Sequence, residues 1–459
     1  MIRYIRIILF SALLFSVIPS FSAERKDTVQ FAYDVNFDMN FDNREFSRSR
    51  FSPAMTIFGS RLSPSLGFSV KQTAGLSHKV MLGADLMKDF GSQEDSIGLM
   101  KEMTMYYLLQ KKTEKNHFTL QAGIFPRTSM EGYYSDAFFS DSLKFYDNNI
   151  EGLLLKLRRK NAYFEAGCDW MGQYSKYHRE RFMIFTAGSG KVLPFLSLGY
   201  SAYMYHFANS ETVKGLVDNF LFNPYVKADF GSLVGLDELS VRAGWIEVLQ
   251  NDRMNIGHYI FSGGAEIALE ARHRDIGIRN TIFAGRTLMP LYNKYDRSGN
   301  KSGNILYFGD PFYRLNDDDA DMGGIYDKLE IFYEPYVGGC LKVQACAVFH
   351  FTHVKYAGCQ QVTSGIRSPA ASCQQTEVIL NNDVAATAKR HWLPKREGTH
   401  GVGRTAGSSC HIVVYVVVWQ MCRTLYGLCH IFHPGAARTF DQDYRIVHRI
   451  RLQPLSKFG

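Results

Sequence analysis

Residues 29–41 alternate between apolar and polar side chains without a break. The odd positions are Val29, Phe31, Tyr33, Val35, Phe37, Met39 and Phe41, and the even positions carry Gln, Ala, Asp or Asn. Successive side chains of a β-strand point to opposite faces, so the segment predicts a strand with one apolar and one largely polar face. A soluble sheet shows this pattern too, but the residues upstream favour a membrane location.

The first 23 residues are typical of a secretory signal peptide. Arg3 and Arg6 precede an apolar run over residues 7–18, and Ser20 and Ser22 form a small-x-small cleavage signal. The apolar run is shorter than the roughly 20 residues that a membrane-spanning helix needs. We therefore expect a cleaved leader and an exported chain. An exported strand with an apolar face and an Asp- and Asn-rich face suits a barrel wall with lipid outside and water inside.

Alternating segments recur through residue 351 and predict 15 strands. The further segments lie near 54–71, 80–86, 103–109, 118–124, 153–157, 162–166, 182–188, 196–204, 223–231, 239–245, 265–271, 276–285, 327–335 and 341–351. Short connections alternate with long ones, an arrangement typical of outer-membrane barrels with short periplasmic turns and long external loops. The predicted fold class is all-β, an antiparallel transmembrane β-barrel of about 16 strands, within a range of about 14–18. Because such barrels have even strand numbers, one more strand should follow residue 353, where the alternation fails.

The net charge of +8 belongs to the two ends of the chain. Residues 362–459 carry a net charge of +7 and the leader carries +2, which leaves residues 24–361 close to neutral at −1. The sequence has no nucleic-acid-binding motif, and export argues against such a partner. The basic composition therefore says little about the predicted barrel.

From Val362 onward the chain has a different composition. It is basic and rich in Cys and His, and no acidic residue occurs between Gly398 and Phe440. The cysteines after residue 339 lack the C-x₂-C spacing of a zinc site. We expect that a frameshift or fusion near codon 362 replaced the native last strand; the alternative is a genuine, unusual extension. The predicted organisation is a signal peptide at 1–23, a barrel at 24–361 and an atypical tail at 362–459 outside the barrel.

The leader, the strand at 29–41 and the alternation of long loops with short turns resemble the outer-membrane β-barrel porins of Gram-negative bacteria. The resemblance covers residues 24–361 and is architectural. It implies localisation in the cell outer membrane, contact with outer-membrane lipids and lipopolysaccharide, and passage of small polar solutes. It also implies that the third external loop, here residues 126–149, folds inward and narrows the pore. Trimers are common among porins, so a homo-oligomer is possible.

The loop at 126–149 interleaves charged and aromatic side chains. Folded inward, its carboxylates would favour the passage of cations, whereas its aromatic rings would suit a sugar. The alternative is that the rings pack the loop onto the rim and the acids are solvated. The candidate constriction residues are Glu131, Asp136, Asp141, Asp147, Arg127, Lys144, Tyr133 and Tyr134.

Polar faces of the predicted strands should line the lumen. There, opposite charges commonly pair across a barrel and hold its shape. Rim aromatics such as Trp170, Tyr205 and Trp245 would form girdles at the membrane interfaces. The lumen-facing candidates are Asp34, Asn36, Asp38, Arg242, Glu266, Glu270 and Arg272.

The loop at 286–326 contains an acidic cluster, Asp317, Asp318, Asp319 and Asp321. Clustered oxygens suit Ca²⁺, but Gly323 and Lys328 depart from the pattern of an EF-hand loop. A solvated acidic loop, or loose cation bridging to lipopolysaccharide, is the alternative. We predict no metal site and no cofactor.

Catalytic motifs are weak in this sequence. Residues 188–191 read Gly-Ser-Gly-Lys but lack the first Gly and the Ser/Thr of a phosphate-binding loop, and the sequence has no G-x-S-x-G or H-E-x-x-H. His117, Ser140 and His206 are present without a spacing that joins them. We therefore expect a porin-like channel that is not an enzyme, for small polar solutes with a cation or neutral preference. The alternatives are a non-conducting barrel that binds a ligand or partner through its external loops, and a hydrolase at the rim.

Overall fold

The computed structural model describes residues 28–46, 49–72, 75–92, 99–296, 299–315, 323–337, 341–352 and 359–367. These residues belong to one compact unit within residues 1–384. The predicted leader, the acidic cluster Asp317–Asp321 and the tail from residue 368 lie outside the described residues.

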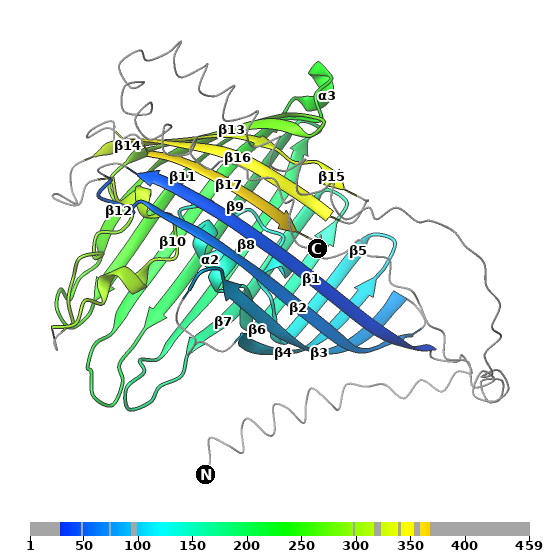
Figure 1. Ribbon diagram of the computed structural model, residues 1–459, viewed down its shortest axis with the longest axis horizontal. Coiled ribbons are helices and arrows are strands. Elements are labelled where there is room, and N and C mark those ends of the chain that lie inside the picture. The colour runs from blue at the N-terminus through cyan, green and yellow to red at the C-terminus, as the bar shows by residue number, and fades with distance from the viewer. Residues whose placement is uncertain are drawn as a thin grey trace, which may run out of the picture. The chain divides into compact units, whose positions relative to one another are not determined.

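An antiparallel sheet dominates the described part of the chain, and each long strand pairs with the next in sequence (Figure 1). The strands are β1 (Thr28–Phe46), β2 (Met55–Lys71), β3 (Leu76–Asp89), β4 (Met100–Lys112), β5 (Asn116–Pro126), β6 (Asn149–Arg159), β7 (Ala162–Gly172), β8 (Arg181–Leu193), β9 (Leu196–Phe207), β10 (Val217–Asp229), β11 (Glu238–Asp252), β12 (Ile260–His273), β13 (Ile276–Gly285), β14 (Gly324–Tyr333), the two-residue β15 (Tyr336–Val337), β16 (Leu341–Thr352) and β17 (Cys359–Arg367). All 15 predicted strands are present, and the all-β antiparallel prediction is confirmed.

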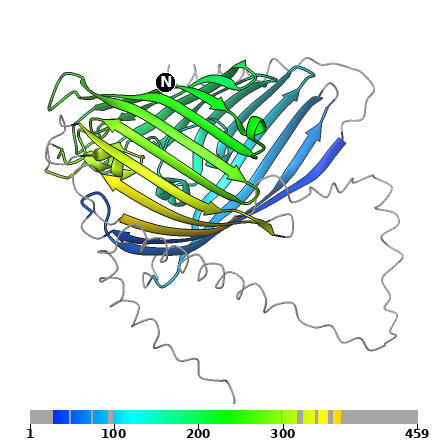
Figure 2. The ribbon, with the colours of Figure 1, turned by 90° about the horizontal axis from the view of Figure 1, so that it is seen from above.

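The order of strands returns to its starting point. β1 pairs with β2 along one edge and with β17 along the other, and β17 also pairs with β16. Figures 1 and 2 show the strands curving around a common interior. This arrangement gives both edges of β1 a hydrogen-bonding partner strand.

β17 corrects the boundary predicted after residue 361. Its residues 362–367 pair with β16 and β1, so the sheet extends six residues further, to Arg367. Backbone N–H and C=O groups pair in a ladder whatever the side chains are, which is why a segment without alternation can fill this place. The origin of the chain beyond Arg367 remains a prediction.

The two faces of the sheet differ as the alternation predicts. Val29, Phe68 and Met105 are each more than half exposed on the outer face. Their sequence neighbours point inward, among them the buried Gln30 and Ser69. Among the described residues, no helix has the length and apolar composition needed to cross a membrane.

Two connections and their short helices occupy much of the interior. The first holds η2 (Arg127–Ser129) and α2 (Asp141–Tyr146), and the second holds η3 (Gly303–Leu306) and η4 (Pro311–Arg314); α3 (Gly231–Val234) lies in the turn between β10 and β11. Phe138 of the first connection packs against Tyr203 of β9, and Phe308 of the second packs against Tyr205. Each fully buried aromatic side chain of this kind stabilises the fold by about 1.5–3 kcal/mol.

Candidate functional site

The connection at 127–148 is fastened to the wall by Glu165 of β7. The buried Glu165 carboxylate accepts hydrogen bonds from the backbone N–H groups of Glu131 (2.9 Å) and Gly132 (3.1 Å), and from the Tyr134 hydroxyl (3.0 Å). Hydrogen bonds to an ionised acceptor are about twice as strong as neutral ones. The first half of the connection is therefore held firmly against β7.

Arg127 closes the base of this connection. Its Nη2 lies 2.9 Å from Oδ2 of Asp169 and 3.2 Å from Oδ2 of Asp147, and it donates to the carbonyl of Asn149 at 2.9 Å. The first and last residues of the loop are thus joined to β7 through one buried guanidinium group.

The local sequence favours a helical turn at α2. The Ser140 hydroxyl caps the helix by accepting from the Leu143 N–H at 3.2 Å. Asp141 lies in the first turn and Lys144 in the last, where their charges complement the helix dipole. Although α2 has only six residues, these features and the wall contacts keep it in place.

Two arginines of the wall hold α2. Arg44 of β1 donates to the Ser142 hydroxyl at 2.9 Å. Arg61 of β2 donates to the Phe145 carbonyl and pairs with the buried Asp85 of β3. The helix α2 is therefore bound to β1 and β2, whereas the first half of the connection is bound to β7.

The second inward connection, described over residues 286–296 and 299–315, binds the first. The Asp310 N–H donates to the Asp136 carbonyl at 2.7 Å, and the Ser140 N–H donates to the Phe308 carbonyl at 2.7 Å. The two connections therefore form one unit inside the sheet.

Glu266 of β12 joins both connections to the wall. Its carboxylate accepts hydrogen bonds from the Ser135 hydroxyl (2.6 Å), the Tyr313 hydroxyl (2.6 Å) and the Tyr133 hydroxyl (3.3 Å). Glu266 is buried, and these donors satisfy an acid that would otherwise be costly inside the protein.

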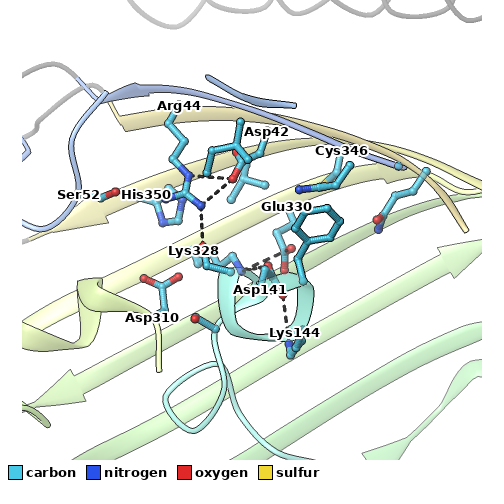
Figure 3. A pocket seen from close by; sticks show the side chains of 18 of the residues that line it. Asp42, Arg44, Ser52, Asp141, Lys144, Asp310, Lys328, Glu330, Cys346 and His350 are labelled. Atoms are coloured by element: carbon cyan, nitrogen blue, oxygen red, sulfur yellow. Dashed lines mark hydrogen bonds and ion pairs between the residues drawn. The ribbon is translucent and has the colours of Figure 1, made fainter. Parts of the chain in front are cut away.

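A cavity of about 350 Å³ remains between α2 and the wall. Figure 3 shows Asp141 and Lys144 on α2 facing wall residues that include Lys328, Glu330 and Arg44. The lining carries five basic and five acidic side chains, and His350 in addition: Arg44, Lys144, Arg279, Lys328, Lys342, Asp38, Asp42, Asp141, Asp310 and Glu330. A cavity with this lining favours water and polar solutes.

Lys328 of β14 also binds the first connection to the wall. Its Nζ lies 2.8 Å from Oδ2 of Asp136, 3.7 Å from Oε1 of Glu330 and 3.8 Å from Oδ2 of Asp141. Burial alone would raise the pKa of Asp136, but the ammonium groups of Lys328 and Lys144 outweigh burial and lower it. Asp136 therefore stays ionised at neutral pH and ties the connection to β14.

Asp310 is in a different electrostatic setting. Burial raises its pKa to about 6, and the nearby Lys328 ammonium offsets burial only in part. Its carboxylate accepts the N–H of Phe312 at 3.0 Å and caps η4. The charge of the cavity lining therefore changes near pH 6.

The structure separates the predicted constriction residues into two groups. Asp141 and Lys144 line the cavity, and Asp136 contacts the wall beside it. The other five fasten the connection to the wall. Arg127 and Asp147 pair at its base, and Glu131 pairs with Lys156 and Arg158. The ring centroid of Tyr133 lies 3.4 Å from Cζ of Arg242, and the Tyr134 hydroxyl donates to Glu165.

The residues predicted to face the lumen lie on the inner side of the sheet. Asp34, Asn36 and Asp38 follow one another on the inner face of β1, and Asp38 lines the cavity. Glu270 pairs with Arg279 at 3.1 Å. Glu266 and Arg242 contact the first connection, as described above, and Arg272 is partly buried on the inner face of β12.

Several residues of the cavity were missed at the level of sequence. Arg279 has the opposite parity to the exposed Ile278 and Ile282 of β13, and Lys328 the opposite parity to the exposed Ile325 of β14. The inward parity of those strands is therefore a signal that identifies them. Asp310 has no such signal, because its position depends on how the second connection folds. The same holds for Arg44, which reaches Ser142 from the end of β1.

Residues 23–208 match the model of one protein family. Its description is Lipid A 3'-O-deacylase-type, and the match covers less than half of the chain. A search of curated protein sequences gave no match.

Solved structures similar to this chain include outer-membrane proteins and porins. OmpT of Vibrio cholerae has 11% identity, with 76% of this chain and 99% of that chain covered at a TM-score of 0.45. OccD3 of Pseudomonas aeruginosa has 8% identity and a TM-score of 0.41, and the match covers 77% of this chain and 95% of that chain. A mutant of the Rhodopseudomonas blastica porin has 10% identity and a TM-score of 0.37, and the match covers 74% of this chain and 99% of that chain.

The family match shows that the expectation of a protein that is not an enzyme is wrong, because the matching family is described by an enzymatic activity. Short motifs such as G-x-S-x-G identify sites whose residues lie close in sequence. A catalytic site assembled across the strands of a sheet has no such spacing. The absence of these motifs therefore says nothing about whether the protein is an enzyme.

The predicted outer-membrane localisation and the resemblance to porin-like barrels are confirmed. The described strands carry an apolar outer face, as strands in contact with lipid require.

Proposed function

We propose that the chain forms a closed 16-strand transmembrane barrel that lets small polar solutes diffuse through the cavity between α2 and the wall. The observation that carries the proposal is the charge-balanced lining of that cavity, with five acidic and five basic side chains. Such a lining favours neutral solutes while Asp310 is ionised, because its acidic and basic charges then balance. The strand count leaves out the two-residue β15.

Strand pairing supports the closed barrel. β1 pairs with both β2 and β17, and a spanning sheet must close because an unpaired edge in lipid costs several kcal/mol for each group. Sixteen long strands also agree with the even numbers found in bacterial single-chain barrels.

The two inward connections would act as the constriction. They fill the side of the interior next to β7–β12 with aromatic side chains, and they leave the polar cavity next to β1, β13, β14 and β16. Ion pairs such as Lys328–Asp136 hold the connections at that distance from the wall. Solutes would pass along a fixed gap whose charges are already mutually neutralised.

Liposome swelling tests this proposal. Vesicles containing the purified full-length protein should swell in small neutral sugars, and the rate should fall steeply as the sugar becomes larger. Substituting Ser142→Trp on α2 should slow the swelling, since Ser142 lines the cavity. Ser232→Trp, at an exposed position of α3 in the turn between β10 and β11, is the matched control and should leave the rate unchanged. Folded protein that gives no swelling would contradict the proposal.

A second candidate function is removal of an acyl chain from lipid A. The observation that favours it is the match of residues 23–208 to the Lipid A 3'-O-deacylase-type family. Incubation of the purified protein with lipid A, followed by mass spectrometry, tests it directly: loss of one acyl chain supports it, and unchanged lipid A contradicts it.

A further inference from the structure

A second cavity, of about 290 Å³, lies within the first inward connection itself. The residues that line it come from both ends of the connection and include Arg127, Met130, Tyr133, Lys144 and Asn148. Small-molecule pockets usually have volumes of about 300–1,000 Å³, so this cavity matches the small end of that range. It has room for one small ligand.

The apolar part of this lining is aromatic. Tyr133, Tyr134 and Phe139 border the second cavity, together with Met130. The ring centroids of Tyr134 and Phe139 are 5.2 Å apart, and their planes meet at 59°. Because aromatic rings attract one another in offset and tilted arrangements, these side chains favour a ligand that carries an aromatic ring.

The polar part of the lining is rich in hydrogen-bond donors. Arg127 and Lys144 are cations and Asn148 is a neutral amide, whereas none of the described residues that line the second cavity is acidic. Asp147 and Asp141, which pair with the two cations, lie outside the lining. A sugar brings several hydroxyl donors that need acceptors, whereas a carboxylate brings acceptors alone. The lining therefore favours an anionic ligand.

Arg127 has a donor group that the protein leaves unused. Its Nε and Nη2 bind Asp147, Asn149 and Asp169. Its Nη1 is buried and makes no hydrogen bond with the residues that the structure describes. A buried donor without an acceptor is costly. A carboxylate oxygen of a ligand would supply the missing acceptor.

The aromatic rings of the second cavity are already held in place. The Tyr134 hydroxyl donates to Glu165 of β7, and the Tyr133 hydroxyl donates to Glu266 of β12. Both rings are thus fixed by the wall and not by a ligand. A preorganised site loses less conformational entropy when a ligand binds, which favours affinity.

We propose that the second cavity binds a small aromatic carboxylate, with its ring among Tyr133, Tyr134 and Phe139 and its carboxylate toward Arg127 and Lys144. Lys144 also lines the cavity between α2 and the wall, so the ligand would lie beside the path proposed for solutes. Binding here does not require that solutes cross the membrane, so it can occur whether or not the channel conducts.

Isothermal titration calorimetry of the purified full-length protein in detergent micelles, with sodium benzoate as the ligand, tests the proposal. The titration is made at about pH 7.5, where carboxylic acids are ionised. Benzoate should bind about tenfold more tightly than acetate, which lacks the ring, and about tenfold more tightly than benzamide, which lacks the charge.

Asn148→Asp places a carboxylate in the lining with almost no change of shape. The backbone carbonyl of Asn148 accepts from the Arg127 N–H at 2.7 Å, so the new charge stays beside the cavity. Benzoate should bind this variant about tenfold more weakly, because like charges repel. Asn161→Asp, at an exposed position between β6 and β7, is the matched control and should leave the affinity unchanged.

Lys144→Gln tests the cation of the lining and should also weaken benzoate binding about tenfold. Its matched control is Lys227→Gln, since Nζ of Lys227 likewise pairs with a carboxylate, at 3.3 Å from Oε1 of Glu238, and Lys227 lines neither cavity. This control should bind benzoate with the affinity of the unsubstituted protein.

Three outcomes would overturn the proposal. The first is equal affinity of Asn148→Asp and the unsubstituted protein for benzoate. The second is equal affinity of the unsubstituted protein for benzoate and benzamide, which would mean that the charge is not recognised. The third is binding of glucose in place of benzoate, which would indicate a sugar site. A protein that binds benzoate but does not swell liposomes would contradict the channel alone, which separates the two tests.

Discussion

The hydroxyl of Tyr313 donates a 2.6 Å hydrogen bond to the carboxylate of Glu266, and through it the second inward connection is bound to β12. The same carboxylate accepts from Ser135 of the first connection. One buried side chain of the wall thus holds both parts of the proposed constriction.

Substituting Glu266→Ala should loosen the constriction. The change leaves the hydroxyls of Ser135 and Tyr313 without their acceptor, at a cost of about 1–3 kcal/mol each. We expect a larger and noisier single-channel conductance and a lower midpoint of urea unfolding. Glu266→Gln keeps an acceptor oxygen and should be intermediate. Glu247→Ala on the outer face is the control, and equal effects of the Glu266 and Glu247 substitutions would refute the role of Glu266.

Lys328→Met should change both stability and selectivity. The substitution leaves Asp136 and Glu330 without their buried partner and should destabilise the protein by about 3–5 kcal/mol. The lining then carries an excess of acid, so the channel should prefer cations. Lys342→Gln is the comparison for stability, since Lys342 is more exposed and its Nζ lies 2.8 Å from Oε2 of Glu334. This substitution should lower the free energy of unfolding by no more than about 1 kcal/mol. An unchanged reversal potential in Lys328→Met would contradict this account.

A preference for anions should appear as the pH is lowered through the pKa of Asp310. Because burial raises that pKa to about 6, Asp310 is ionised at neutral pH and takes up a proton as the solution is acidified. The lining then loses one negative charge and its balance shifts toward positive. Reversal potentials measured in a salt gradient at about pH 7.5 and about pH 5 check this, since these values lie on either side of the pKa. Asp310→Asn should show a much smaller change, and an equal change in that variant would count against Asp310.

Arg61→Leu should release α2 from the wall. Arg61 pairs with the buried Asp85 and donates to the Phe145 carbonyl, so the substitution leaves a buried carboxylate without its cation. We expect a loss of about 3–5 kcal/mol of stability. The double substitution Arg61→Leu with Asp85→Leu removes both charges and should recover much of that loss. No recovery in the double variant would show that the ion pair is not the cause.

The strands were predictable because their signal is local. Alternation such as that of Val29 to Phe41 reports on two faces of one strand, and every predicted strand is present. One more strand after residue 353 was expected only because such barrels have even strand numbers, and β17 is that strand. Its position was not predictable, since it is set by backbone pairing with β1 and β16 and its residues do not alternate.

The site was predictable in part. The position of the loop at 126–149 and its charges pointed to Asp136, Asp141 and Lys144, which lie at the cavity or beside it. Most other charges in that loop proved to be anchors, because their partners come from neighbouring strands, as Lys156 of β6 does for Glu131. Asp310 depends on the path of a long connection, which no pattern in the sequence describes.

The conductance of the purified protein in a planar lipid bilayer, measured in a salt gradient, tests the central claim most directly. The account predicts stepwise channels with little charge preference at neutral pH, and a preference for anions on acidification. A folded and inserted protein that stays silent would contradict the channel and leave lipid A deacylation as the function to test.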